Sequence, residues 1–542
     1  MIELTGKGVS GGYALGKINF IKNPSHNSDS ENVYLAQDIN LELAQYETAV
    51  EEAKNELSQL YDLTLKNAGK EEAEIFEIHK TMLDDPDFKN RIKELITKDR
   101  ESAPSAAKIA GDEFSAVFSA MEDTYMQERA KDVSDITERL ISILRGNGTN
   151  AAPKLSGIAA ADDFLPSQTV SMDKSTVLAF ISREGSQNSH AAILARSMNI
   201  PAVAALKDSL SEKYDGAFAA VDGYSGKVYI DPSPEILDQI RRKSKEEENS
   251  RKEIAAYFGL ATETKSGKHI NLFANIGKSA DISDVIKNDA EGIGLFRSEF
   301  MFLGRNALPS EEEQFEAYKT VAEQMNGKKV IIRTLDIGAD KSAPYLNLPK
   351  EENPAMGLRA IRLCLARQDI FKTQLRALCR ASAFGNISIM LPMIVSVNEI
   401  TSAKKLLFEV KEELASKKIS MSEKIELGIM IETPAAAVTS DILAKEADFF
   451  SIGTNDLTQY TLAADRQCSA VSSLFENQNK SVLRLIEFTA KNAAENGIWA
   501  GICGEMAADT SLTDFFVNIG ISELSVSPKY ILPLRKKIRS LL

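Results

Sequence analysis

The fold of this chain is decided by stretches such as Phe449-Phe450-Ser451-Ile452-Gly453-Thr454-Asn455-Asp456. A short apolar run, of the length of a buried strand, ends here in a glycine and a group of polar residues. A helical pattern then follows. Short apolar strands that alternate with amphipathic helices favour parallel βα units, so this stretch predicts one such unit.

The same rhythm recurs through the C-terminal half of the chain. Eight such units fit a closed barrel, so we expect a C-terminal (β/α)8 TIM-type barrel over residues 260–542. The seven further runs that predict its strands are Ile270–Ala274, Gly292–Phe296, Val330–Leu335, Ile387–Met393, Glu426–Ile431, Ile498–Cys503 and Glu523–Val526.

The N-terminal half predicts an α/β domain that is interrupted by helices. Its first twenty residues alternate glycine with apolar residues and indicate one or two short strands. Residues 1–24 and 146–231 should form this domain, and residues 25–145 an inserted helical subdomain, with Leu43, Val50 and Leu57 at helical spacing. A mixed-charge run predicts a linker helix within 232–259. The later strand segments are Gly157–Ala160, Thr176–Phe180, Ala202–Ala205, Ala217–Val221 and Lys227–Ile230.

Composition excludes several classes of protein. The net charge of −14 over 542 residues argues against a nucleic acid or an anionic membrane as the main partner. The chain contains no run of eighteen apolar residues, so no membrane span is expected. The N-terminus lacks the pattern of a signal peptide. The four cysteines show no CxxC spacing and suit a reducing compartment, so we expect a cytoplasmic protein.

Polar and ionisable residues gather where the predicted strands end, and this is the face at which such barrels carry their chemistry. Arg297, Arg333 and Arg466 would supply planar guanidinium groups, which bind phosphate and carboxylate groups through two hydrogen bonds at once. Glu432 and Asp456 would supply the carboxylates that commonly hold Mg²⁺ together with substrate oxygens. Each of these residues taken alone is more often structural, because ion pairs are common at barrel rims. Their grouping favours a small anionic substrate bound through a metal.

A second candidate centre is His190. Ser189 before it is a plausible N-cap, and the alanines and leucine after it favour a helix. His190 would then lie in the first turn, where free N–H groups and the helix dipole favour an anion such as a phosphoryl group on the imidazole. The alternative is a surface or core histidine without a chemical role.

Several long strings of residues resemble one family. The chain is similar to enzyme I of the bacterial sugar phosphotransferase system, the phosphoenolpyruvate–protein phosphotransferases, through nearly its whole length. The strings that carry the resemblance are Ser189-His190-Ala191-Ala192-Ile193-Leu194-Ala195-Arg196-Ser197, Ile200-Pro201-Ala202-Val203, Arg333-Thr334-Leu335-Asp336-Ile337-Gly338, Lys350-Glu351-Glu352-Asn353-Pro354, Glu432-Thr433-Pro434-Ala435-Ala436-Ala437, Phe449 to Tyr460, and Cys503-Gly504-Glu505.

The resemblance implies a role for each matching residue. His190 matches the phosphorylated histidine of the N-terminal α/β phosphohistidine domain, and Cys503 the acid that protonates the enolate carbon to give pyruvate. For Cys503 alone, a buried apolar cysteine is the alternative. Glu432 and Asp456 match the Mg²⁺ ligands. The residues that match the phosphoenolpyruvate site are Arg297, Arg333, Asn455, Asp456 and Arg466, with Arg359 and Lys341 as further contributors.

The resemblance also implies partners. The helical subdomain near Glu72 to Asp85 would dock the histidine phosphocarrier protein HPr, and the barrel would form a homodimer. With phosphoenolpyruvate and Mg²⁺ the protein would carry out the first step of sugar uptake by this system.

Departures and rival interpretations are few. Gly185-Ser186-Gln187-Asn188 replaces the usual Gly-Gly-x-Thr, and Ala339 stands where a glycine is common. The chain ends at Leu542, earlier than usual, which bears on the barrel's closing layer, its stability and the dimer contact. The related dikinases and synthases need a nucleotide-binding domain for which there is no room. A regulatory binding paralogue that kept the fold and lost catalysis is the rival from another class.

Overall fold

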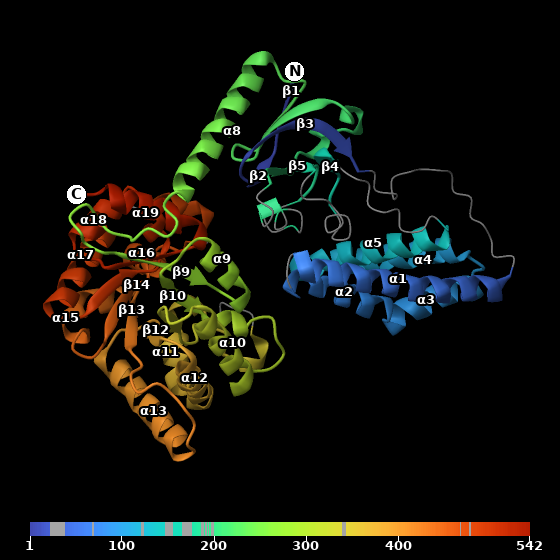
Figure 1. The fold of residues 1–542 in the computed structure, drawn as a ribbon. Helices are drawn as coiled ribbons and strands as arrows, with labels where there is room; N and C mark the ends of the chain where they lie inside the picture. Colours follow the sequence, from blue (N-terminus) through green and yellow to red (C-terminus); the bar gives the residue numbers. More distant parts are fainter. Residues whose placement is uncertain are drawn as a thin grey trace. The chain divides into compact units, whose positions relative to one another are not determined.

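The computed structural model divides the chain into two compact units, Met1–Ser250 and Arg251–Leu542 (Figure 1). None of the described helices combines the length and the apolar character needed to cross a membrane. The structure describes residues 1–21, 38–67, 70–120, 124–146, 156–164, 176–185, 189, 192, 195–196, 200–338, 343–466, 468–475 and 478–542.

The first unit contains an eight-stranded mixed sheet in the order β1-β8-β7-β3-β4-β5-β6-β2. The N-terminal strands pair with the later ones: β3 lies parallel to β4 and antiparallel to β7. The expected joining of the two segments in one sheet is therefore confirmed, with three N-terminal strands instead of one or two. The strands are β1 (Ile2–Thr5), β2 (Lys7–Ser10), β3 (Tyr13–Phe20), β4 (Gly157–Ala161), β5 (Val177–Ser182), β6 (Ala202–Ala204), β7 (Phe218–Asp222) and β8 (Lys227–Ile230).

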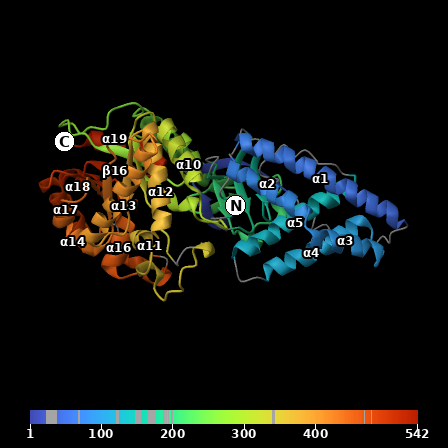
Figure 2. The same ribbon diagram turned by 90° about the horizontal axis from the view of Figure 1, so that it is seen from below.

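The inserted segment is helical, as expected, and its helices lie side by side (Figure 2). Val50 and Leu57, predicted from their helical spacing, are buried, whereas Leu43 is only half-buried and packs against the margin of the core. Asp85 caps the third helix, because its side chain accepts hydrogen bonds from the N–H groups of Asp87 and Phe88. The helices are α1 (Ile39–Asn67), α2 (Lys70–Leu83), α3 (Pro86–Thr97), α4 (Ala103–Ser119) and α5 (Thr124–Leu144).

The mixed-charge run that predicts a linker helix, Arg241 to Glu253, lies in α8 (Pro234–Ala255). The helix extends well beyond the charged run on its N-terminal side. Its side chains are mostly exposed, and Ile240 is its buried residue. This pattern is typical of a solvated helix with one point of packing.

The second unit is a closed barrel of eight parallel strands, so the predicted barrel is confirmed. It closes where β16 pairs with β9 in parallel over Glu523–Val526. The strands are β9 (Asn271–Ile276), β10 (Gly292–Arg297), β11 (Val330–Arg333), β12 (Ile387–Leu391), β13 (Leu427–Ile431), β14 (Phe449–Ile452), β15 (Trp499–Ile502) and β16 (Glu523–Val526).

Alternation along each strand divides the barrel's core into two layers. On β14, Phe450 and Ile452 pack outward into the large core beneath the helices, whereas Phe449 belongs to the small core inside the barrel. The surrounding helices are α9 (Ile282–Lys287), α10 (Glu311–Gln324), α11 (Ala360–Ala366), α12 (Gln368–Ala381), α13 (Val397–Ser416), α14 (Pro434–Val438), α15 (Ser440–Leu443), α16 (Thr454–Leu462), α17 (Lys480–Glu495), α18 (Thr513–Asn518) and α19 (Ile531–Ser540).

Candidate active site

The predicted barrel residues stand at the carboxyl ends of neighbouring parallel strands. Arg297 ends β10 and Arg333 ends β11, and the two are register partners. Glu432 directly follows β13, and Cys503 directly follows β15. Asp456 lies in the first turn of α16, just after β14. Because the strands of the barrel are parallel, the topology brings these residues to one face.

Arg333 is held by carboxylates in the barrel interior. Its side chain is buried, and it forms ion pairs with Glu299 and, at 3.1 Å, with Asp336. Burial alone would lower the pKa of Arg333, but the attraction of these carboxylates raises it above its ordinary value. The guanidinium is therefore a fixed positive charge at the end of β11.

Asp336 connects Arg333 to a second arginine. Its other oxygen, Oδ1, accepts a hydrogen bond from Nη2 of Arg359 at 2.7 Å. Nη1 of Arg359 in turn lies 3.3 Å from the hydroxyl of Tyr460. The sequence predicts the arginines of the site but not that Asp336 holds two of them in place. The signal for this role was the position of Asp336, three residues after Arg333 at the end of the same strand. One carboxylate thus orients two guanidinium groups.

Glu432 is the most unusual carboxyl group of the site. Its side chain is fully buried, and Oε1 accepts a hydrogen bond of 2.5 Å from the N–H of Met393. Within the described part of the chain Oε2 has no hydrogen-bond partner. Burial, followed by repulsion from Asp456 and Asp336, raises the pKa of Glu432 well above its ordinary value, although Arg333 opposes the shift.

The space beside Glu432 is kept open by a glycine. A Cβ atom built on Gly453 would lie 3.1 Å from Oε2 of Glu432, closer than side chains normally approach. An orphaned buried oxygen next to a second carboxylate, Asp456, suits a small hard cation that takes its other ligands from substrate and water. Within the described residues no group of three or more histidine, cysteine, aspartate or glutamate side chains forms a fuller metal cluster.

Asn455 and Arg466 occupy different settings. Oδ1 of Asn455 accepts a hydrogen bond of 2.9 Å from the N–H of Glu505, which joins the loops after β14 and β15. Arg466 lies beyond the end of α16 with an exposed side chain, and its backbone N–H lies 3.2 Å from Oε1 of Gln459. The described contacts do not bring the Arg466 guanidinium to the other arginines.

Cys503 lies inside the barrel. It is 3% exposed, and its Sγ lies 3.7 Å from the carbonyl oxygen of Ile452. Burial raises the pKa of the Cys503 thiol from 9.0 to about 12. The residue is therefore a neutral thiol that carries a proton throughout the physiological pH range.

This raised pKa predicts poor reactivity toward alkylating reagents. At pH 8 a thiol with a pKa of about 12 is roughly a thousandfold less ionised than one with a pKa of 9.0, and only the thiolate attacks iodoacetamide. We expect the exposed Cys468 to be alkylated rapidly in the folded protein, and Cys503 only after unfolding. Peptide mass spectrometry at successive times measures both, with Cys468→Ser as the control. Equally fast alkylation of the two cysteines contradicts this assignment.

His190 and Lys341 lie outside the described residues, as do Ser186, Asn188 and Ala339. Two described neighbours of His190 agree with the expected helix start. Oγ of Ser189 accepts a hydrogen bond from the N–H of Ala192 at 3.4 Å, the geometry of an N-cap. Nη1 of Arg196 donates to the carbonyl oxygen of Val9 on β2 at 3.2 Å, which attaches the segment to the sheet.

Three models of domains from phosphoenolpyruvate-utilising enzymes match the chain. The N-terminal domain model matches residues 5–129, the mobile domain model 155–226 and the phosphoenolpyruvate-binding domain model 251–542. The phosphoenolpyruvate-protein phosphotransferase of Geobacillus stearothermophilus is 45% identical over 99% of this chain and 93% of its own. The chain belongs to the phosphoenolpyruvate-protein phosphotransferase family.

Other members of the phosphoenolpyruvate-protein phosphotransferase family match equally fully. The proteins of Priestia megaterium and Bacillus subtilis are each 43% identical to this chain and cover 99% and 100% of it, with 94% and 95% of their own lengths. The binding-domain model spans every barrel residue of the candidate site. The mobile domain model spans His190. The resemblance derived from the sequence is thereby confirmed.

Proposed function

We propose that this protein transfers the phosphoryl group of phosphoenolpyruvate to His190 and releases pyruvate. Two observations carry the proposal. Asp336 fixes the guanidinium groups of Arg333 and Arg359, and Arg333 acts on Glu432, whose Oε2 has no hydrogen-bond partner among the described residues. Fixed positive charges and an incomplete cation site suit a small substrate that carries both a phosphate and a carboxylate. Family membership selects phosphoenolpyruvate among such substrates.

The residues present fit a bound Mg²⁺. Glu432 and Asp456 would hold it, and the ion would neutralise charge on the substrate's phosphate and carboxylate. Its positive charge would also favour the ionised form of Glu432, the reverse of the effect that burial has on this carboxyl.

The chain's own residues supply the remaining steps. Arg297 and Arg333 would bind and orient the substrate's anionic groups, with Asn455 and Arg466 as further contacts. The neutral imidazole of His190 would attack phosphorus, and the bond from phosphorus to the enol oxygen would break. Cys503, protonated at neutral pH, would give its proton to the methylene carbon of the enolate to form pyruvate.

The proposed function predicts a fixed stoichiometry. In the absence of any carrier protein, Mg²⁺ and excess phosphoenolpyruvate should give close to one pyruvate and one acid-labile phosphate per chain. His190→Ala should give neither, whereas His269→Ala, which changes a half-exposed histidine in the barrel unit, should behave as wild type. Pyruvate without protein-bound phosphate, or equal labelling of wild type and His190→Ala, contradicts the proposal.

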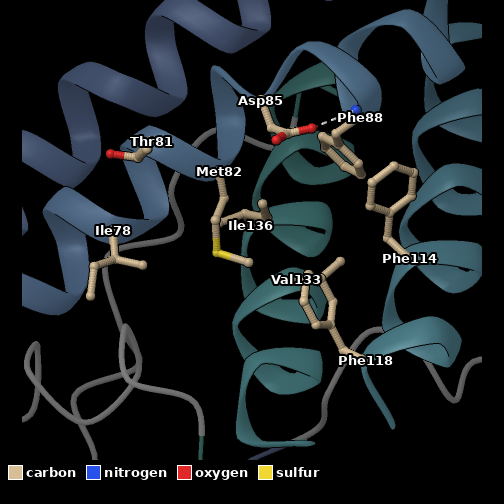
Figure 3. A pocket seen from close by; sticks show the side chains of 9 residues that line it. All are labelled: Ile78, Thr81, Met82, Asp85, Phe88, Phe114, Phe118, Val133 and Ile136. Atoms are coloured by element: carbon tan, nitrogen blue, oxygen red, sulfur yellow. Dashed lines mark hydrogen bonds between the residues drawn. The ribbon is translucent and has the colours of Figure 1, made fainter. Parts of the chain in front are cut away.

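We further propose that the phosphoryl group passes to HPr, which docks on the helical subdomain. A pocket of about 260 Å³ opens between α2, α3, α4 and α5, and Figure 3 shows the side chains gathered around it. Its lining is mainly apolar and includes Met82, Phe114 and Phe118, with the capping Asp85 at its edge. The expected docking segment near Glu72 to Asp85 overlaps this lining; the side chain of Glu72 lies outside what the structure describes.

An apolar pocket of this size would accept one or two apolar side chains of the partner. Phe118→Ala removes part of the lining from a half-buried position. We expect transfer from the phosphorylated enzyme to HPr to become roughly tenfold less efficient, because a contact of this kind contributes about 1–2 kcal/mol. Labelling by phosphoenolpyruvate should not change. The matched control is Phe408→Ala, which removes a 63% exposed aromatic ring from the barrel unit. Unchanged transfer by Phe118→Ala contradicts docking at this pocket.

The homodimer that the resemblance implies and the cytoplasmic location expected from the sequence stay predictions. Sedimentation of the protein at several concentrations measures the first.

A further inference from the structure

A second buried carboxyl group lies inside the barrel. Glu523 begins β16 and is 1% exposed. Leu524 and Val526 pack into the outer core, so the alternating residues Glu523 and Ser525 face the interior. Oε1 of Glu523 has no hydrogen-bond partner among the residues that the structure describes. Burial raises the pKa of Glu523 well above its ordinary value, against the opposing charge of Lys329, which favours the protonated form of this carboxyl group.

Two glycines leave room for this carboxyl group. Gly501 on β15 is the register partner of Glu523, and a Cβ atom built on it would lie 1.8 Å from Oε2 of Glu523. A Cβ atom on Gly294 of β10 would lie 2.5 Å from Oε1. The carboxyl group therefore fills the space that side chains at these two positions would occupy. The sequence of the neighbouring strands accommodates an acid at this point.

Gly501 lies between Glu523 and Ser451 in the sheet and on the same strand as the residue before Cys503. Gly501 pairs with Ser451 on β14 on its other side, so Glu523 and Ser451 flank it in one row of the sheet. Cys503 follows two residues later on the same face, roughly 7 Å further along the strand. The buried hydroxyl of Ser451 forms no hydrogen bond of normal geometry with any described residue, yet it lies close enough to the thiol to lower the Cys503 pKa.

We propose that Glu523 returns a proton to Cys503 through the hydroxyl of Ser451 after each turnover. This inference rests on the proposed function. When the S–H bond of Cys503 breaks and its proton forms a C–H bond in pyruvate, a thiolate remains. Ser451 gives its proton to the thiolate and takes one from the Glu523 carboxyl group, and the resulting carboxylate recovers a proton from water.

The position of Cys503 explains why an internal proton source would help. The thiol is 3% exposed, so bulk water has little access to it from the substrate side. The charged groups that act on the two ends of the route are Lys329 at Glu523, and Glu432 and Arg333 at Cys503. The Lys329 side chain is 23% exposed and pairs with Glu426, so solvent reaches that end of the barrel.

The test separates the first turnover from later ones. Glu523→Gln keeps the shape of the side chain and removes its transferable proton. The matched control is Glu409→Gln, which changes a carboxylate paired with Lys372 elsewhere in the barrel unit. With Mg²⁺, phosphoenolpyruvate and HPr, rapid quenching should show a first pyruvate at the wild-type rate, because Cys503 begins protonated. Later turnovers should be at least about 10-fold slower in Glu523→Gln. Ser451→Ala should show the same difference between the first and later turnovers.

A pH profile provides the second readout. Wild-type steady-state turnover should fall as the pH rises and the Glu523 carboxyl group ionises. The turnover of Glu523→Gln should not show this fall. Later turnovers at the wild-type rate overturn the relay, as does a first turnover slowed as much as the later ones, which indicates a purely structural effect. A wild-type protein that forms no pyruvate refutes the proposed function itself, and the relay with it.

Discussion

Glu432→Gln should lower phosphoenolpyruvate-dependent pyruvate formation by more than about 100-fold while making the folded protein more stable at neutral pH. Loss of an outer-sphere partner already costs a metal site roughly 10- to 100-fold, so loss of a proposed ligand should cost more. Glutamine can keep the hydrogen bond from the Met393 N–H. The activity loss therefore should not come from misfolding.

The stability effect follows from the raised pKa of Glu432. A carboxyl group whose pKa is higher in the folded protein than its unfolded value of about 4.3 destabilises the fold as pH rises above that value. Glutamine cannot ionise, so without metal we expect Glu432→Gln to raise the free energy of unfolding at pH 7.5 and to change it little at pH 4. Thermal unfolding at the two pH values measures the gain, with Glu426→Gln as the control. Lower stability at pH 7.5, or unchanged activity, contradicts the assigned role.

Arg333→Ala and Arg297→Ala should separate substrate binding from structural support. Arg333 is buried between Glu299 and Asp336, and its removal leaves two buried carboxylates with one positive partner fewer. We expect Arg333→Ala to lower the free energy of unfolding by about 3–5 kcal/mol. Arg297 is half-buried and forms no ion pair among the described residues, so Arg297→Ala should change stability by less than about 0.5 kcal/mol.

Both substitutions should impair catalysis. A charge-assisted contact contributes about 1.5–3 kcal/mol, so Arg297→Ala should reduce kcat/KM for phosphoenolpyruvate by roughly 10- to 100-fold. Arg333→Lys keeps the charge but loses the bidentate fork, and should lose activity with a smaller loss of stability than Arg333→Ala. Urea unfolding and initial rates measure the two effects. Full activity of a folded Arg297→Ala protein removes Arg297 from the proposed site.

The sequence predicts strands best where a run is short and sharply bounded. Phe449–Ile452 was predicted to the residue, because a charged residue precedes it and Gly453 ends it. The prediction Val330–Leu335 was two residues too long. Leu335 is apolar and buried, but its N–H donates to the side chain of Gln374, so the strand ends at Arg333. Hydrophobicity cannot report which partner a backbone N–H finds.

The residues of the candidate site also differ in how well the sequence predicts their positions. Arg297, Glu432 and Cys503 could be placed from the sequence because parallel strands bring their carboxyl ends to one face. The pairing of Arg333 with Glu299 could not be predicted, since it depends on side-chain packing between two strand ends. The interior position of Glu523 also could not be predicted, because it requires knowing which glycine stands opposite.

The location of the phosphoryl group tests the central claim most directly. The protein should be incubated with Mg²⁺ and phosphoenolpyruvate, quenched in base to preserve phosphohistidine, digested and mapped by mass spectrometry. The account predicts one phosphoryl group per chain, on the peptide that contains His190. Its presence instead on a peptide with His26, His79 or His269, or on no histidine while pyruvate accumulates, would contradict the account.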